Sequence, residues 1–226
     1  MKNLIVFFLF SLSISITVEA QEDRFTTAMT ALIEQMTVED PSAIDWPSIT
    51  NKLERIGSAE PDQWLPHYYL SYANLQLAMS AMNQGNPQGV EQYVKLSEAH
   101  LGKAKELTAM NSELKCMEGY VAQGYIWIDP MNNGPQYAGA AHAAYAAAIA
   151  MDEANPRPHM LRGMLTLFTP EFFGGGAEKA KPMLDAASAL YEQESATDKG
   201  ILPAWGQPTN NWMVQKAARD LAASDE

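Results

Sequence analysis

The side chains that could carry chemistry in this sequence are four histidines, one cysteine and several pairs of carboxylates. No histidine has a second histidine four residues along or a Glu-x-x-His arrangement, so no helical metal site is predicted. The pair Glu192 and Glu194 lies among polar residues and is interpreted as solvated surface rather than as a general acid and base. The histidines are His67, His100, His142 and His159.

The cysteine and the glycine run offer no reactive site either. Cys116 is the only cysteine, so no disulfide can form within the chain, and we interpret it as a small buried apolar residue rather than a reactive thiol. The run Gly174-Gly175-Gly176 lacks the following Lys-Ser or Lys-Thr of a phosphate loop and indicates a flexible turn. The sequence therefore predicts no catalytic residue, no metal ligand and no cofactor, and a protein that is not an enzyme.

The most regular pattern is one of helix packing. Three segments carry a small, a large and a small residue at i, i+4 and i+7, which lie on one face of a helix and let a neighbouring helix approach closely. The second segment follows the first by 44 positions, and the third follows the second by 39. The triplets are Ser97, Leu101 and Ala104; Ala141, Tyr145 and Ala148; and Ala180, Leu184 and Ala187.

A cap and a proline introduce each of these helices. Asn86-Pro87, Asp129-Pro130 and Thr169-Pro170 lie 10 or 11 residues ahead of the first small position. Such a side chain accepts hydrogen bonds from free backbone amides, while proline ends the preceding helix. Three units of this kind predict a stack of antiparallel helix hairpins.

These paired helices resemble tetratricopeptide repeats, with the additional residues placed in the turns DPMNNGPQY and TPEFFGGG. Gly119 and Gly163 match the small position of the family's first helix. The residues NPR, TPEFFGGG and Pro203–Gly206 also resemble exported bacterial helical-repeat proteins, including subunits associated with TRAP-type transporters. The resemblance implies an all-α fold, a short right-handed solenoid of TPR-like hairpins.

The same resemblance implies a concave groove along the first helices. We expect five residues to line it and to bind a partner, because methionines and one arginine suit an extended peptide or a helix. Packing against the neighbouring repeat is an equal alternative for these residues. They are Tyr120, Gln123, Arg157, Met160 and Met164.

Residues 1–20 read as a cleavable signal peptide, with Lys2, an apolar segment and a small-x-small site before Gln21. A membrane anchor is the alternative, but the apolar segment is short for one. No cysteine follows it, so no lipid anchor is expected. Residues 21–226 are then predicted to form one periplasmic or secreted domain of three to four helix pairs with a C-terminal capping segment, without stable membrane insertion.

Several side chains outside the repeats have predicted positions. Leu65, Tyr69 and Tyr72 are expected in the core, although an aromatic binding face is the alternative for the tyrosines. Pro182 predicts a late start or a kink in its helix. Trp205, in a polar strap after Glu194, is expected to pack on the last hairpin, before a final helix over about 211–223.

The net charge of −12 argues against nucleic acid or an anionic membrane surface as a partner. The first hypothesis is an envelope adaptor that binds another protein or peptide through the groove. The alternative is a small-molecule carrier or transporter accessory with a cavity lined by tyrosine and methionine. An enzyme with an unrecognised helical site is a third hypothesis, and a homo-oligomer stays open.

Overall fold

The computed structural model of the chain describes residues 21–38 and 40–224, and regular secondary structure in them is entirely helical. None of the described helices is long and apolar enough to cross a membrane. The proposed signal segment, 1–20, lies outside the described residues. A helix over residues 21–36 precedes the labelled elements, which are η1 (Pro41–Ala43), α2 (Trp46–Ala59), α3 (Trp64–Asn83), α4 (Pro87–Leu107), α5 (Ser112–Ile128), α6 (Pro130–Met151), α7 (Pro156–Phe168), η2 (Glu171–Phe173), α8 (Ala177–Glu194) and α9 (Gln207–Ser224).

Local capping sets where most of these helices begin. Asn86, Asn111 and Asp129 each accept a hydrogen bond from the backbone amide three residues on, and Asn155 accepts one from the amide of Arg157. Proline follows at the first helical position of α4, α6 and α7, where its missing N–H has no partner to lose.

The expectation that DPMNNGPQY forms a turn is wrong. Helix α6 begins at Pro130, directly after its cap Asp129, so this segment forms the first turns of the helix. Pro135 lies inside it and removes only one backbone hydrogen bond. Pro182 likewise lies inside α8, which begins at Ala177 rather than late.

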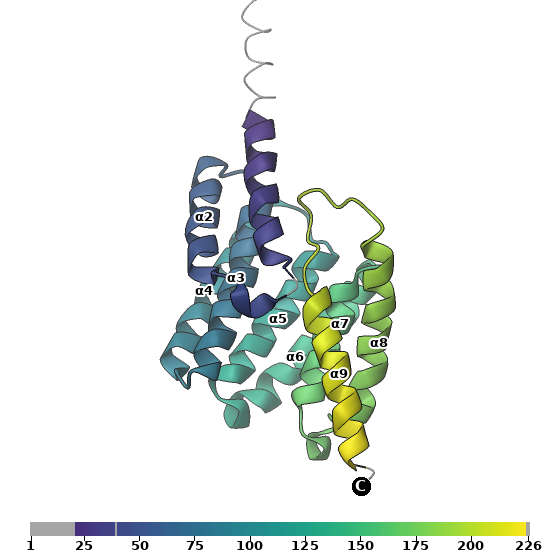
Figure 1. The fold of residues 1–226 in the computed structure, drawn as a ribbon. Coiled ribbons are helices and arrows are strands. Elements are labelled where there is room, and N and C mark those ends of the chain that lie inside the picture. The colour runs from purple at the N-terminus through teal and green to yellow at the C-terminus, as the bar shows by residue number, and fades with distance from the viewer. Residues whose placement is uncertain (1–20, 39, 225–226) are drawn as a thin grey trace, which may run out of the picture.

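The helices pack as consecutive pairs. α3 packs on α4, α5 on α6 and α7 on α8, while α4 with α5 and α6 with α7 join neighbouring pairs. Contacts of α5 with both α3 and α7 bring the three first helices side by side (Figure 1). α2 covers α3 at one end of the stack, and α9 covers α8 at the other. All nine residues of the three triplets are buried, as predicted, and so are Leu65, Tyr69 and Tyr72.

Two glycines allow the close approach within pairs. A Cβ at Gly119 would lie 2.5 Å from Tyr145 Cε1, and one at Gly163 would lie 2.6 Å from Leu184 Cδ2. In both pairs, the glycine of the first helix (α5 or α7) lies against the large residue of the triplet in the second helix (α6 or α8). The close packing therefore depends on the absence of these side chains.

Gly163→Ala is expected to lower the free energy of unfolding by about 1–3 kcal/mol, because the added methyl overfills a packed contact with Leu184. Gly102→Ala is the matched control, since a Cβ at this position in α4 would meet nothing within 4 Å. There alanine should raise stability by about 0.5–1 kcal/mol. Urea unfolding measures both, and equal effects would contradict this account of the packing.

Candidate functional site

A non-helical strap, residues 195–206, connects α8 to α9 (Figure 1). It carries one aromatic side chain, Trp205. Trp205 is 3% exposed. Its ring stacks on Tyr72 of α3 with centroids 4.1 Å apart, and it lies nearly parallel to Tyr120 of α5 at 6.3 Å. Trp205 contacts the last hairpin, as expected, with the Arg157 guanidinium carbon 5.9 Å from its ring centroid, and it also reaches the first hairpin.

Hydrogen bonds hold the strap in this position. Trp205 Nε1 donates to the Tyr68 hydroxyl at 3.0 Å, and the Tyr191 hydroxyl donates to the Trp205 carbonyl at 3.1 Å. The Tyr69 hydroxyl donates to the Ile201 carbonyl at 3.1 Å. Gly206 follows with φ of 112°, and a Cβ there would overlap the Tyr191 hydroxyl, so glycine is required. Hydrogen bonds from two helices, α3 and α8, therefore anchor the strap.

The strap also takes part in an ion network, which is formed by Glu113, Arg157, Glu194 and Lys199. The Arg157 side chain is 1% exposed and binds Glu194 through two hydrogen bonds, of 2.8 and 2.9 Å. Its Nε donates to Glu113 at 2.8 Å, and Lys199 of the strap binds Glu194 at 3.1 Å. The interpretation of Glu194 as solvated surface is wrong, because its side chain is only 9% exposed and is paired.

Burial and charge act in opposite directions in this network. Burial alone would raise the pKa of Glu194, but the hydrogen bonds and charges of Arg157 and Lys199 hold it below its ordinary value. Burial also raises the pKa of Tyr68 well above its ordinary value, and its hydroxyl donates to Glu113 at 2.7 Å. Glu194 and Arg157 are therefore a charged pair beside a neutral phenol at neutral pH.

The five residues expected to line a partner-binding groove are all at most 5% exposed. Gln123 accepts a hydrogen bond from the Tyr145 hydroxyl, the Met160 sulfur lies 3.5 Å from the Tyr191 hydroxyl, and Tyr120 bonds Gln76 and Met79. These contacts are typical of packing residues, which is the alternative to partner binding that the sequence left open. Cys116 is also fully buried, and burial raises its pKa well above the ordinary value. A partner-binding role for the five remains a prediction.

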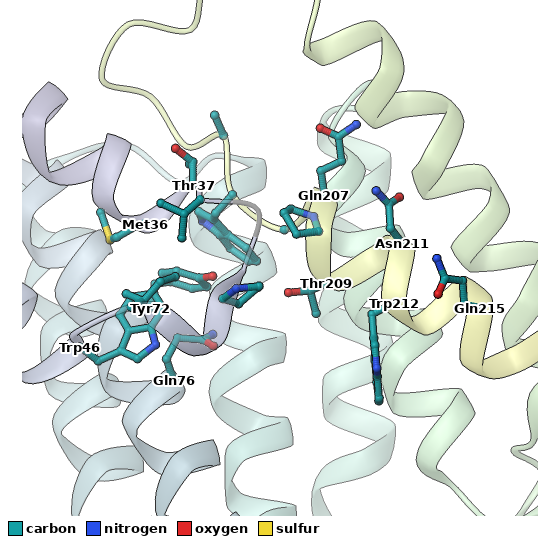
Figure 2. Close-up of a pocket in the computed structure, with 17 residues that line it drawn as sticks. Met36, Thr37, Trp46, Tyr72, Gln76, Gln207, Thr209, Asn211, Trp212 and Gln215 are labelled. Carbon is teal, nitrogen blue, oxygen red and sulfur yellow. The ribbon is translucent and has the colours of Figure 1, made fainter.

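Trp205 also lines a cavity of about 560 Å³, which we call the aromatic pocket. Figure 2 shows Trp46 and Tyr72 on one wall and Trp212 on the other, which α9 forms. The remaining lining comes from the end of the 21–36 helix, from η1 and from the strap. The lining residues are Met36, Thr37, Val38, Pro41, Ile44, Trp46, Tyr72, Gln76, Ala204, Trp205, Gly206, Gln207, Pro208, Thr209, Asn211, Trp212 and Gln215.

The described lining residues are all uncharged, and they combine aromatic faces with amide and hydroxyl groups. Gln207, Asn211 and Gln215 follow one another at intervals of four along one face of α9 (Figure 2). Trp212 is 50% exposed, although burying an indole normally stabilises a protein. The arrangement suits a flat, largely apolar ligand with a few neutral hydrogen-bonding contacts.

A second cavity, of about 590 Å³, lies against the opposite part of the strap. It contains Trp64, Met110 and Leu202, but also the charged Glu113, Asp152 and Lys199. The described residues elsewhere bring together no group of three or more His, Cys, Asp or Glu side chains that could hold a metal ion.

Comparisons with known proteins give one clear structural likeness. The chain matches no family model, and no curated protein is similar to it in sequence. Among solved structures it resembles the HusA haemophore from Porphyromonas gingivalis, with a TM-score of 0.70 and 24% identity. The likeness covers 88% of this chain and 92% of the haemophore. What the two proteins share is the helical fold.

Sequence reasoning did not identify the aromatic pocket. Trp205 was placed only on the last hairpin, and Trp212 lies within the final helix expected over about 211–223. The neighbours of these tryptophans differ, Asp45 and Pro47 at Trp46, Ala204 and Gly206 at Trp205, and Asn211 and Met213 at Trp212, so no local pattern linked them. Nothing in the sequence indicated that segments so far apart meet.

Proposed function

We propose that this protein is an exported carrier that binds a flat aromatic small molecule in the aromatic pocket, and that a haem-type porphyrin is the ligand. The observation that carries the proposal is a cavity of about 560 Å³, a size typical of sites for drug-sized ligands, framed by Trp46, Tyr72, Trp205 and Trp212. The likeness to a haemophore supports it. The buried position of Trp205 favours the carrier hypothesis over the adaptor hypothesis, because an adaptor would need an open groove where Trp205 lies.

The proposal includes the architecture and the export of the chain. The hairpins would form a short right-handed TPR-like solenoid, which the glycine contacts at Gly119 and Gly163 support. Residues 1–20 would be a signal peptide, and 21–226 a single periplasmic or secreted domain that acts by binding rather than by catalysis.

Recognition would rest on the ring system and not on iron. The described lining residues include no histidine, cysteine or carboxylate, which are common iron ligands. Burial raises the pKa of Tyr72 well above its ordinary value, which disfavours a phenolate bound to iron. The thioether of Met36 is the one remaining soft ligand among them. Aromatic stacking and apolar contact would therefore supply most of the binding energy.

The absence of charge among the described lining residues also predicts how acidic groups on the ligand behave. No lysine or arginine in this lining can pair with a carboxylate, and the chain carries a net charge of −12. Carboxylates of a bound porphyrin should remain in water, so added salt should not weaken binding, because no attractive ion pair is screened.

Haemin and metal-free protoporphyrin IX are expected to bind residues 21–226 with similar dissociation constants. Titration followed by tryptophan quenching and porphyrin absorbance measures both. Trp46→Ala and Trp212→Ala should each weaken binding by about 10-fold, equivalent to about 1.4 kcal/mol of lost stacking.

Trp64→Ala is the matched control, because Trp64 lines the second cavity instead. If Trp64→Ala alone weakens binding, the ligand occupies that cavity and the proposed site is wrong. Failure of both porphyrins to bind would refute the carrier function as stated.

A further inference from the structure

Two histidines that sequence analysis left without a role face each other between helices α3 and α4. His67 Nδ1 lies 3.4 Å from His100 Nδ1. The ring planes differ by 21°, and the centroids are 5.7 Å apart, so the two nitrogens point toward each other. The spacing of 33 residues hides the pair from any local sequence pattern.

A carboxylate from a third helix fixes the protonation of one ring. Glu54 of α2 lies with Oε1 3.2 Å from His100 Nε2, which places the imidazole proton on Nε2. The Nδ1 of His100 then presents its lone pair to His67. A carboxylate that orients a histidine through its second nitrogen is the usual support of a histidine bound to a metal.

We propose that His67 and His100 form a two-histidine site for a divalent transition-metal cation, with Glu54 as the residue that orients His100. Two nitrogens bound to one tetrahedral ion at about 2.0–2.1 Å would be separated by about 3.4 Å, the spacing of the two Nδ1 atoms. Imidazole favours zinc, copper or nickel over calcium or magnesium, which prefer oxygen.

The surroundings fit such a cation. The two Nδ1 atoms lie at hydrogen-bonding distance, so an ion would take the place of the proton between them. His67 is only partly buried and its ring lies beside Gly57. The His100 side chain is 15% exposed and that of Glu54 55%, so ion and water can enter. Burial lowers the pKa of both histidines, against the opposite effect of the Glu54 charge, and a lowered pKa favours the neutral rings that bind metal.

Only two protein atoms would bind the ion, and water would complete its coordination. The described residues contain no group of three His, Cys, Asp or Glu ligands, so a tightly held structural ion is not implied. The site is separate from the proposed carrier function, because none of its three residues lines the aromatic pocket.

The test is zinc binding to tag-free residues 21–226, by calorimetry, with cobalt spectra as a second probe. One equivalent of zinc per chain is expected, and calcium should not bind. His67→Gln and His100→Gln should abolish binding, while Glu54→Gln should weaken it about 10-fold or more. Zinc should also raise the melting temperature of the wild type, but not that of His67→Gln.

His159→Gln is the matched control, since His159 is another partly buried histidine whose pKa is lowered by burial. It should bind zinc as the wild type does. Circular dichroism establishes that each variant is folded. Absence of zinc binding in the wild type, or equal affinity in wild type and His67→Gln, would overturn the proposal whatever the porphyrin titrations show.

Discussion

Replacing Arg157 by methionine is expected to lower the free energy of unfolding by about 3–5 kcal/mol, measured by urea unfolding at pH 7. The guanidinium is 1% exposed and bonds both Glu113 and Glu194, so its removal leaves two carboxylates facing each other in a largely buried site. The loss is a large fraction of the stability of an ordinary domain.

The difference in unfolding free energy between the wild type and Arg157→Met should narrow at acid pH. In the wild type the pKa of Glu194 is held below its ordinary value of 4.5. Its ionisation therefore contributes stability that is present above pH 4.5 and is lost as the pH falls through the lowered pKa. Without Arg157 that contribution is reduced, so the variant should lose less stability than the wild type on acidification.

Two controls separate charge from packing. Lys181→Met breaks an exposed pair with Asp185 in α8 and should cost less than about 1 kcal/mol. Adding Glu113→Gln and Glu194→Gln to Arg157→Met should recover part of the loss, because neutral amides leave no unpaired charge. If the triple variant is less stable than the single one, the ionic explanation is wrong.

Trp205→Ala is expected to cost about 3–5 kcal/mol of stability and to weaken porphyrin binding in the fraction that remains folded. The ring is 3% exposed, stacks on Tyr72 and separates the aromatic pocket from the packed interior. Its removal leaves a cavity and frees the strap. Urea unfolding and the porphyrin titration measure the two effects.

Two further variants, Trp205→Phe and Trp127→Ala, serve as comparisons for the stability loss expected of Trp205→Ala. Phenylalanine keeps an aromatic ring but loses the hydrogen bond that Nε1 donates to Tyr68, which should lower the free energy of unfolding by about 1–3 kcal/mol. Trp127 contacts Tyr120 edge-on and is only partly buried, so its truncation should cost less than that of Trp205. A Trp205→Ala variant as stable as Trp127→Ala would show that the strap is not anchored by its tryptophan.

Sequence by itself determined the helical hairpins of this protein. The caps at Asn86 and Asp129 and the buried triplets, such as Ala180, Leu184 and Ala187, act over one or two helical turns, so their consequences are local. The segment after Asp129 was wrongly expected to form a turn because it contains proline and glycine, whereas the cap at Asp129 starts a helix there that accommodates Pro135.

Only the tertiary structure decided what the hairpins enclose. Trp205 bonds Tyr68 across 137 positions, Arg157 pairs with Glu113 across 44, and the aromatic pocket draws on segments from Met36 to Gln215. No periodicity links such residues, because their proximity follows from how the helix pairs stack and from where an irregular strap crosses them. For that reason the helices and their pairing were predictable from the chain, while the pocket, the buried ion network and the histidine pair were not.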